Sequence, residues 1–145
     1  FMEQKEKKQP VSLKSLMSPS KTVTIDFPGY EGFTVDLCHL SRDELIKLRK
    51  RCLVNKFNKK SHVAEEVLDD DKFLTEYCKS IIKGWKGLKF RYLEELLLVE
   101  TDDLDPDSEL EYSKENAEVL MKNASVFDTW VTETVGDLEN FTRAK

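Results

Sequence analysis

The stretch from Asp69 to Leu88 constrains the fold of this 145-residue chain more than any other. Its apolar residues recur every three or four positions, as on a helix that buries one face. They are Phe73, Leu74, Tyr77, Cys78, Ile81, Ile82 and Trp85. Aspartates precede the stripe and lysines follow it, which is the order that the helix dipole favours. The pattern predicts a central helix that ends at Gly87, a residue type common just past a helix.

Residues 21–38 carry the period-two alternation of a β-hairpin. Apolar residues alternate with polar ones on both sides of a Pro-Gly turn. They are Val23, Ile25 and Phe27 before it, and Phe33, Val35 and Leu37 after it. Because two strands alone are marginal in water, the apolar face must pack on helices or the hairpin edge must pair with another chain.

The segment that follows predicts a helix from Ser41 to about Leu53. Ser41 and Glu44 have the spacing of a capping box. The residues expected on its buried side are Leu45, Ile46, Leu48 and Cys52. Residues 55–60 are basic and predict a loop, and residues 62–68 fit either a short helix or a strand.

The second half of the chain predicts further helices separated by polar breaks. Residues 89–99 are apolar enough for a helix, and residues 100–111 form an acidic loop that contains Pro106. Ser113 is a candidate N-cap, and Ser125 is placed to cap a last helix. The apolar side of that helix carries Phe127, Trp130, Val131, Leu138 and Phe141.

These segments together predict an α+β fold, mostly helical, in which an N-terminal β-hairpin packs on four or five helices. Residues 21–142 form one domain, between a polar, flexible N-terminal extension at residues 1–20 and a polar tail at residues 143–145. The predicted core motif consists of Phe73, Tyr77, Ile81, Trp85, Phe127 and Trp130. Within the N-terminal extension, residues 11–17 are apolar enough to dock on a partner, although a frayed tail fits them as well.

The net charge of −5 is unevenly distributed along the chain. Residues 42–60 hold eight Lys or Arg against two acidic residues, and residues 100–140 hold thirteen Asp or Glu against two lysines. Such asymmetry favours head-to-tail contact between copies, or simply gives two solvated faces.

Residue patterns that carry chemistry are missing from the sequence. Cys38, Cys52 and Cys78 are scattered, which indicates reduced thiols in a cytosolic setting rather than a zinc site. Neither a nucleophile elbow nor a phosphate-binding glycine loop is present. We therefore expect no enzyme, no metal and no cofactor, and the lack of a long apolar run argues against a membrane partner.

Contact with a macromolecular partner is the remaining class of function. The expected binding residues lie on the hairpin and on the basic helix; they are Val23, Ile25, Phe33, Val35, Lys47, Arg49, Lys50 and Arg51. The basic patch at residues 47–60, with Phe57 available for stacking, also suits nucleic acid, but a sequence pI of about 5.2 argues against it.

The order of these segments resembles a known family over about residues 20–142. The motifs on which the resemblance rests are GWKGL at residues 84–88, YSKEN at residues 112–116, and the spacing of Phe127, Trp130 and Phe141. Together they resemble the tail assembly chaperones of long-tailed (siphovirus-type) bacteriophages.

The resemblance implies a non-catalytic role in the host bacterial cytoplasm. Such chaperones bind and solubilise the tape measure protein, are displaced by the major tail protein as the tube polymerises, self-associate, and are absent from the mature virion. A minor structural virion protein, for tail completion or head–tail joining, is the alternative, and a nucleic-acid-binding protein is a third.

Overall fold

The computed structural model describes residues 10–17 and 21–142 of the chain. The predicted C-terminal tail, and residues 1–9 and 18–20 of the predicted N-terminal extension, lie outside the described residues. The described residues contain both helices and antiparallel strands, which confirms the predicted α+β class. In chain order the elements are α1 Leu13–Leu16, β1 Thr22–Asp26, β2 Thr34–Cys38, α2 Arg42–Arg51, β3 Leu53–Asn58, β4 Val63–Leu68, α3 Asp70–Ile81, β5 Ile82–Lys86, α4 Phe90–Leu96, α5 Lys114–Asn123, α6 Ser125–Gly136 and α7 Glu139–Thr142.

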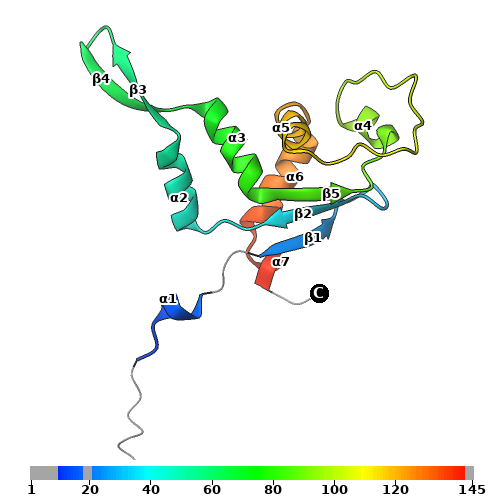
Figure 1. Ribbon diagram of the computed structural model, residues 1–145, viewed down its shortest axis with the longest axis horizontal. Helices are drawn as coiled ribbons and strands as arrows, with labels where there is room; N and C mark the ends of the chain where they lie inside the picture. The colour runs from blue at the N-terminus through cyan, green and yellow to red at the C-terminus, as the bar shows by residue number, and fades with distance from the viewer. Residues whose placement is uncertain (1–9, 18–20, 143–145) are drawn as a thin grey trace, which may run out of the picture.

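The main sheet has three antiparallel strands in the order β1-β2-β5 (Figure 1). The predicted hairpin is confirmed, with β1 and β2 paired from Thr22 opposite Cys38 to Asp26 opposite Thr34. The hairpin does not stand as two strands alone, because β5 adds a third strand to the outer side of β2.

The central helix is shorter than predicted. It begins as expected, with the Asp69 carboxylate accepting a hydrogen bond from the Lys72 amide at 3.1 Å. However, α3 ends at Ile81 and the chain passes directly into β5, so the prediction of a helix that ends at Gly87 is wrong.

A register shift explains why β5 has the apolar spacing of a helix. Ile82 lies opposite Leu37 and Trp85 opposite Val35, and the shift between them leaves Lys83 without a partner on β2. This bulge allows two residues three positions apart to face the same side of a sheet. Ile82 and Trp85 are accordingly 0% and 6% exposed.

Gly87 serves the sheet rather than ending a helix. Its φ is +78°, and a Cβ atom on it would lie 2.0 Å from the carbonyl oxygen of Gly32. Only glycine combines this left-handed conformation with such a close backbone approach. The GWKGL segment is therefore a strand followed by a tight contact with the β1–β2 turn.

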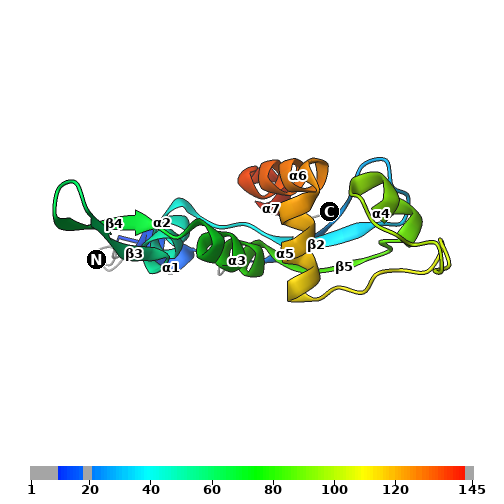
Figure 2. The ribbon, with the colours of Figure 1, turned by 90° about the horizontal axis from the view of Figure 1, so that it is seen from above.

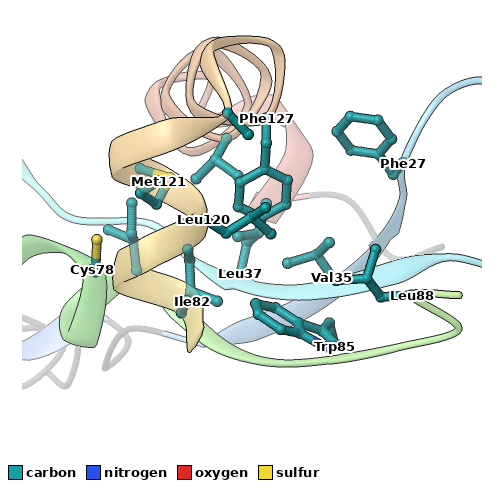
Figure 3. Packing of buried hydrophobic residues seen from close by; sticks show 14 of the residues in the cluster. Phe27, Val35, Leu37, Cys78, Ile82, Trp85, Leu88, Leu120, Met121 and Phe127 are labelled. Carbon is teal, nitrogen blue, oxygen red and sulfur yellow. The ribbon is translucent and has the colours of Figure 1, made fainter. Parts of the chain in front are cut away.

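The core lies between one face of the sheet and the helices α5 and α6 (Figures 2 and 3). Val35, Leu37 and Trp85 contribute from the sheet, and Leu120 and Phe127 contribute from the helices. The opposite sheet face is polar, as the hydrogen bond from Thr24 to Asp36 at 2.6 Å illustrates. A sheet with one face packed on the core and one face exposed to solvent is typical of antiparallel strands.

Most of the predicted core motif takes part in this core. Ile81, Trp85 and Phe127 are buried, and Tyr77 and Trp130 pack against the cluster while partly exposed. Phe73 lies outside the cluster and stacks on Tyr77 instead, with ring centroids 5.6 Å apart.

The predicted capping box at the start of α2 is confirmed. The Glu44 amide donates to the Ser41 hydroxyl at 3.1 Å, and the Ser41 amide donates to the Glu44 carboxylate at 2.8 Å. Leu48 and Cys52 are buried as expected. Ile46 is 43% exposed, so its placement on the buried side is wrong.

A second hairpin replaces the loop predicted for residues 55–60. Strands β3 and β4 pair along their whole length and form a separate two-stranded sheet. The prediction failed because both faces of this hairpin mix apolar and charged residues, so that neither shows a clean alternation.

The C-terminal half largely follows the sequence. Residues 100–111 contain neither helix nor strand, as predicted, and the Ser113 hydroxyl accepts a hydrogen bond from the Asn116 amide at 3.0 Å at the start of α5. The cap of α6 is Ala124 rather than Ser125. Leu138 is 54% exposed and does not join the buried side of the last helices.

Candidate functional site

Helix α2 and the β3–β4 hairpin form an arm, residues 42–68, whose hairpin projects from the body of the molecule (Figure 1). Both views show the tip of the hairpin pointing away from the main sheet and from α5 and α6 (Figures 1 and 2). The arm is fixed at its base, where Leu48 and Cys52 are buried and the Asp69 amide donates to the Cys52 carbonyl at 2.8 Å. The arm therefore has a rigid root and a hairpin that the main core does not cover.

The hairpin exposes large apolar side chains on both of its faces. Phe57 is 60% exposed, Val63 is 53% exposed and Val54 is 40% exposed. The β3–β4 register places Val54 and Val63 on one face and Phe57 on the other. Because no single neighbouring layer covers both faces, this hairpin offers apolar contact from either side.

Local hydrogen bonds order the tip of the hairpin. The Asn58 side-chain oxygen accepts from the amides of Lys60 and Ser61, at 2.8 and 3.2 Å. His62 has a φ of +59°, and its amide donates to the Asn58 carbonyl at 2.8 Å. The turn is thus held by its own residues, which preforms a hairpin that lacks core support.

Basic side chains lie on both parts of the arm, the helix and the hairpin. Lys47 pairs with Asp43 at 3.1 Å on the exposed side of α2, and the Arg49 guanidinium lies 5.9 Å from the centre of the Phe73 ring. Among residues 10–17 and 21–142, no ion pair involves Lys56, Lys59 or Lys60. The structure therefore joins the predicted basic helix to a basic hairpin, and the combined arm carries eight Lys or Arg against four Asp or Glu.

The predicted binding residues divide into two groups. Lys47, Arg49, Lys50 and Arg51 are exposed on α2. Phe33 and Val35 are 0% exposed, so their assignment to a binding surface is wrong. The two side chains face α5 and α6, which occupy the surface that a partner would need.

Val23 and Ile25 also differ from the expectation. Both are partly buried and pack against the core cluster, so their side chains do not form a free apolar surface. The outer side of β1 is an edge of the three-stranded sheet, and α7 contacts this strand.

The short helix α1 exposes apolar side chains as well. Val11, Leu13, Leu16 and Met17 are each between 63% and 75% exposed, and α1 contains no buried residue. The structure leaves this segment without cover, which fits the frayed tail and the docking segment that the sequence left open equally well.

Groups with reactive potential are separated or buried. All three cysteines are free and buried, and burial, followed by the nearby Glu118 and Asp128, raises the pKa of the Cys78 thiol to about 12. In the part of the chain that the structure describes, no three His, Cys, Asp or Glu residues gather as metal ligands.

A hollow of about 190 Å³ beside α2 is lined by Leu40, Glu44, Lys47, Leu48, Arg51 and Ser80. The Ser80 hydroxyl donates to the Glu76 carbonyl at 2.9 Å.

The residues that sequence reasoning missed are those of the second hairpin. Val54 and Val63 were assigned no role, and Phe57 appeared only as a possible stacking residue within a loop. The available signal was the run Lys59-Lys60-Ser61-His62, which separates two short stretches that contain Val and Phe. A polar break between two such stretches is a hairpin pattern.

Comparison with known proteins identifies a family. None of the helices in residues 10–17 and 21–142 has the length and apolar character that a membrane crossing requires. No curated protein and no solved structure matches the chain. The family model described as YdaY prophage protein matches residues 44–145, which include most of the arm and everything that follows it. The chain therefore belongs to the YdaY prophage protein family and is of phage origin.

Proposed function

We propose that this prophage protein is a non-enzymatic tail assembly chaperone that binds and solubilises the tape measure protein. The observation that carries the proposal is the arm, whose preformed hairpin exposes Phe57, Val63 and Val54 among basic side chains. An exposed apolar hairpin that the core does not need is a recognised sign of a protein-binding surface.

The chemistry of the arm suits a partner that is long, apolar and prone to aggregate. Two-faced apolar contact accommodates an amphipathic helix, and the open edges of β3 and β4 can pair with an extended segment. Because each contact is small and surrounded by charge, binding through the arm would be reversible. A chaperone that must later release its client needs such weak contacts.

The choice of client comes from the resemblance to tail assembly chaperones. The GWKGL and YSKEN motifs belong to β5 and to the start of α5, where they hold the core together. The resemblance thus concerns the scaffold, and the arm is the part of that scaffold that remains available for a client.

Co-expression with the tape measure protein encoded by the same prophage tests the proposal. We expect the tape measure protein to remain in the soluble fraction and to co-elute with this chain on size exclusion. The variant Phe57→Ser/Val63→Ser should lose this effect. Val126→Ser is the matched control, because Val126 is 63% exposed on α6, outside the arm. An insoluble tape measure protein beside well-folded wild-type chain would refute the proposal.

The arm also supports a second candidate function, in single-stranded nucleic acid binding. Lys59 and Lys60 follow Phe57 in the turn of the hairpin, so an exposed aromatic side chain lies close in the chain to positive charge. Stacking on an aromatic side chain with lysines on the backbone is a common way to hold single strands. Retention on a single-stranded DNA column that falls steeply with salt and disappears in Lys59→Glu/Lys60→Glu would favour this candidate.

A further inference from the structure

The end of the molecule opposite the arm is acidic and carries uncovered apolar residues. We call residues 94–111 the acidic end; it contains nine Asp or Glu and no Lys or Arg. Leu98 is 102% exposed, Leu104 is 46% exposed and Val99 is 37% exposed. The acidic end therefore combines apolar side chains with charge, as the arm does, but with the opposite sign.

Part of this acidic charge is used within the chain. Asp107 pairs with Arg91 at 2.6 Å, and the Glu109 carboxylate accepts from the Gly87 amide at 3.1 Å. Within the described residues, Glu100, Asp102 and Asp103 have no cationic partner. These three charges are available to a partner outside the chain.

The arm and the acidic end lie at opposite ends of the longest axis of the molecule (Figures 1 and 2). The hairpin is at one extreme, and α4 with the loop after it is at the other. One copy therefore cannot pair its own arm with its own acidic end. Two copies can do so when they lie head to tail.

Charge also decides which ends of two copies can meet. Contact between two arms would bring basic surfaces together, and contact between two acidic ends would bring carboxylates together. Like charges across an interface are costly, whereas an arm against an acidic end is complementary in both charge and apolar character. A contact of this kind is heterologous, so each added copy leaves one arm and one acidic end free.

We propose that the arm of one copy docks on the acidic end of a second copy and that the chain thereby forms head-to-tail assemblies. Lys59 and Lys60, in the turn of the hairpin, face Glu100, Asp102 and Asp103 of the neighbour, and Phe57 contacts the region of Leu98. This contact does not rest on the proposed chaperone function, because it requires no client. A client bound to the arm would compete with the neighbouring copy.

Two variants that each disable one end test the contact. The arm variant is Phe57→Ser/Lys59→Glu/Lys60→Glu, and the acidic-end variant is Leu98→Ser/Glu100→Gln/Asp102→Asn/Asp103→Asn. All these side chains are exposed, and Asn preserves the turn closed by the hydrogen bond from the Leu104 amide to the Thr101 carbonyl at 2.9 Å. Far-UV circular dichroism confirms folding, and Lys50→Glu/Lys60→Glu is a second arm variant that leaves β3 unchanged.

Sedimentation velocity gives the readout, over about 10 μM to about 1 mM protein, the range expected of a small interface. The wild type should exceed the monomer mass of 16.9 kDa as concentration rises. It should return to monomer in about 0.5 M salt, because screening shortens the reach of charges to a few ångströms.

Mixing the two variants gives the decisive result. Each variant alone should remain monomeric, whereas an equimolar mixture should form a dimer that grows no further, because only one intact arm and one intact acidic end can meet. A monomeric wild type, an acidic-end variant that still associates as the wild type does, or a mixture that stays monomeric would each overturn the proposal. The acidic-end variant keeps its arm intact. Its continued solubilisation of the tape measure protein would therefore separate this contact from the chaperone function.

Discussion

Replacing Gly87 with alanine should strongly destabilise the protein, because the backbone around this glycine, just after β5, leaves no room for a Cβ atom. The substitution adds one Cβ atom 2.0 Å from the carbonyl oxygen of Gly32 and 3.2 Å from the Cα atom of Phe33. Neither neighbour is the end of a flexible side chain, so the β1–β2 turn or the end of β5 must move.

Two contributions set the magnitude. A residue with a Cβ atom in the left-handed region costs about 1–2 kcal/mol. Forcing extra volume into a packed site costs about 1–3 kcal/mol more. The total, about 2–5 kcal/mol, is a large share of the roughly 5–15 kcal/mol by which domains are stable. For a chain of this size it corresponds to a fall in melting temperature of about 5–20 °C.

Gly136→Ala is the matched control, because a Cβ atom there meets nothing within 4 Å and the residue ends helix α6. Alanine at that position should leave stability unchanged or raise it by up to about 1 kcal/mol. Both variants can be compared by thermal and urea unfolding, followed by circular dichroism. Equal melting temperatures for Gly87→Ala and Gly136→Ala would refute the close approach of β5 to the turn.

Three further outcomes follow from particular contacts. Trp85→Phe removes the indole donor that lies 2.9 Å from the Leu110 carbonyl, and chemical denaturation should show a loss of about 1–3 kcal/mol, whereas an unchanged midpoint would contradict the role of that bond. Phe57→Ser should change stability by less than about 0.5 kcal/mol because Phe57 is exposed, and a large drop in melting temperature would show that the hairpin packs on the core. Burial raises the pKa of the Cys78 thiol from 9.0 to about 12. The thiol therefore loses its proton at lower pH in the unfolded chain than in the folded one, so the free energy of unfolding should fall as pH rises from 9.0 to about 12. A thiol reagent at pH 8 should label Cys78 only after unfolding, and rapid labelling of the native protein would disprove its burial.

Local signals in the sequence predicted the parts of the fold that depend on neighbouring residues. The β1–β2 hairpin, the capping box at Ser41 and the N-cap at Ser113 were all correct, because each is decided within a few residues. Strand β5 was missed because the bulge at Lys83 gives Ile82 and Trp85 a helical spacing. Nothing within residues 82–86 distinguishes the two cases without the pairing to β2.

The interaction surface was harder to predict than the fold. The basic residues of α2 were identified from charge alone, and they are exposed. Phe33 and Val35 were misassigned because the sequence shows that a hairpin has an apolar face but not which helices cover it. The β3–β4 hairpin was missed for the opposite reason, since an exposed hairpin has no buried face to produce alternation.

Removing the β3–β4 hairpin tests the central claim most directly. The amide of Asp69 and the carbonyl of Cys52 are only 2.8 Å apart, so a short Gly-Ser linker can replace residues 53–68 without straining α2 or α3. We predict that this shortened chain keeps its melting temperature to within a few degrees but no longer holds co-expressed tape measure protein in the soluble fraction. A shortened chain that remains folded and solubilises the tape measure protein as well as the wild type does would contradict the account.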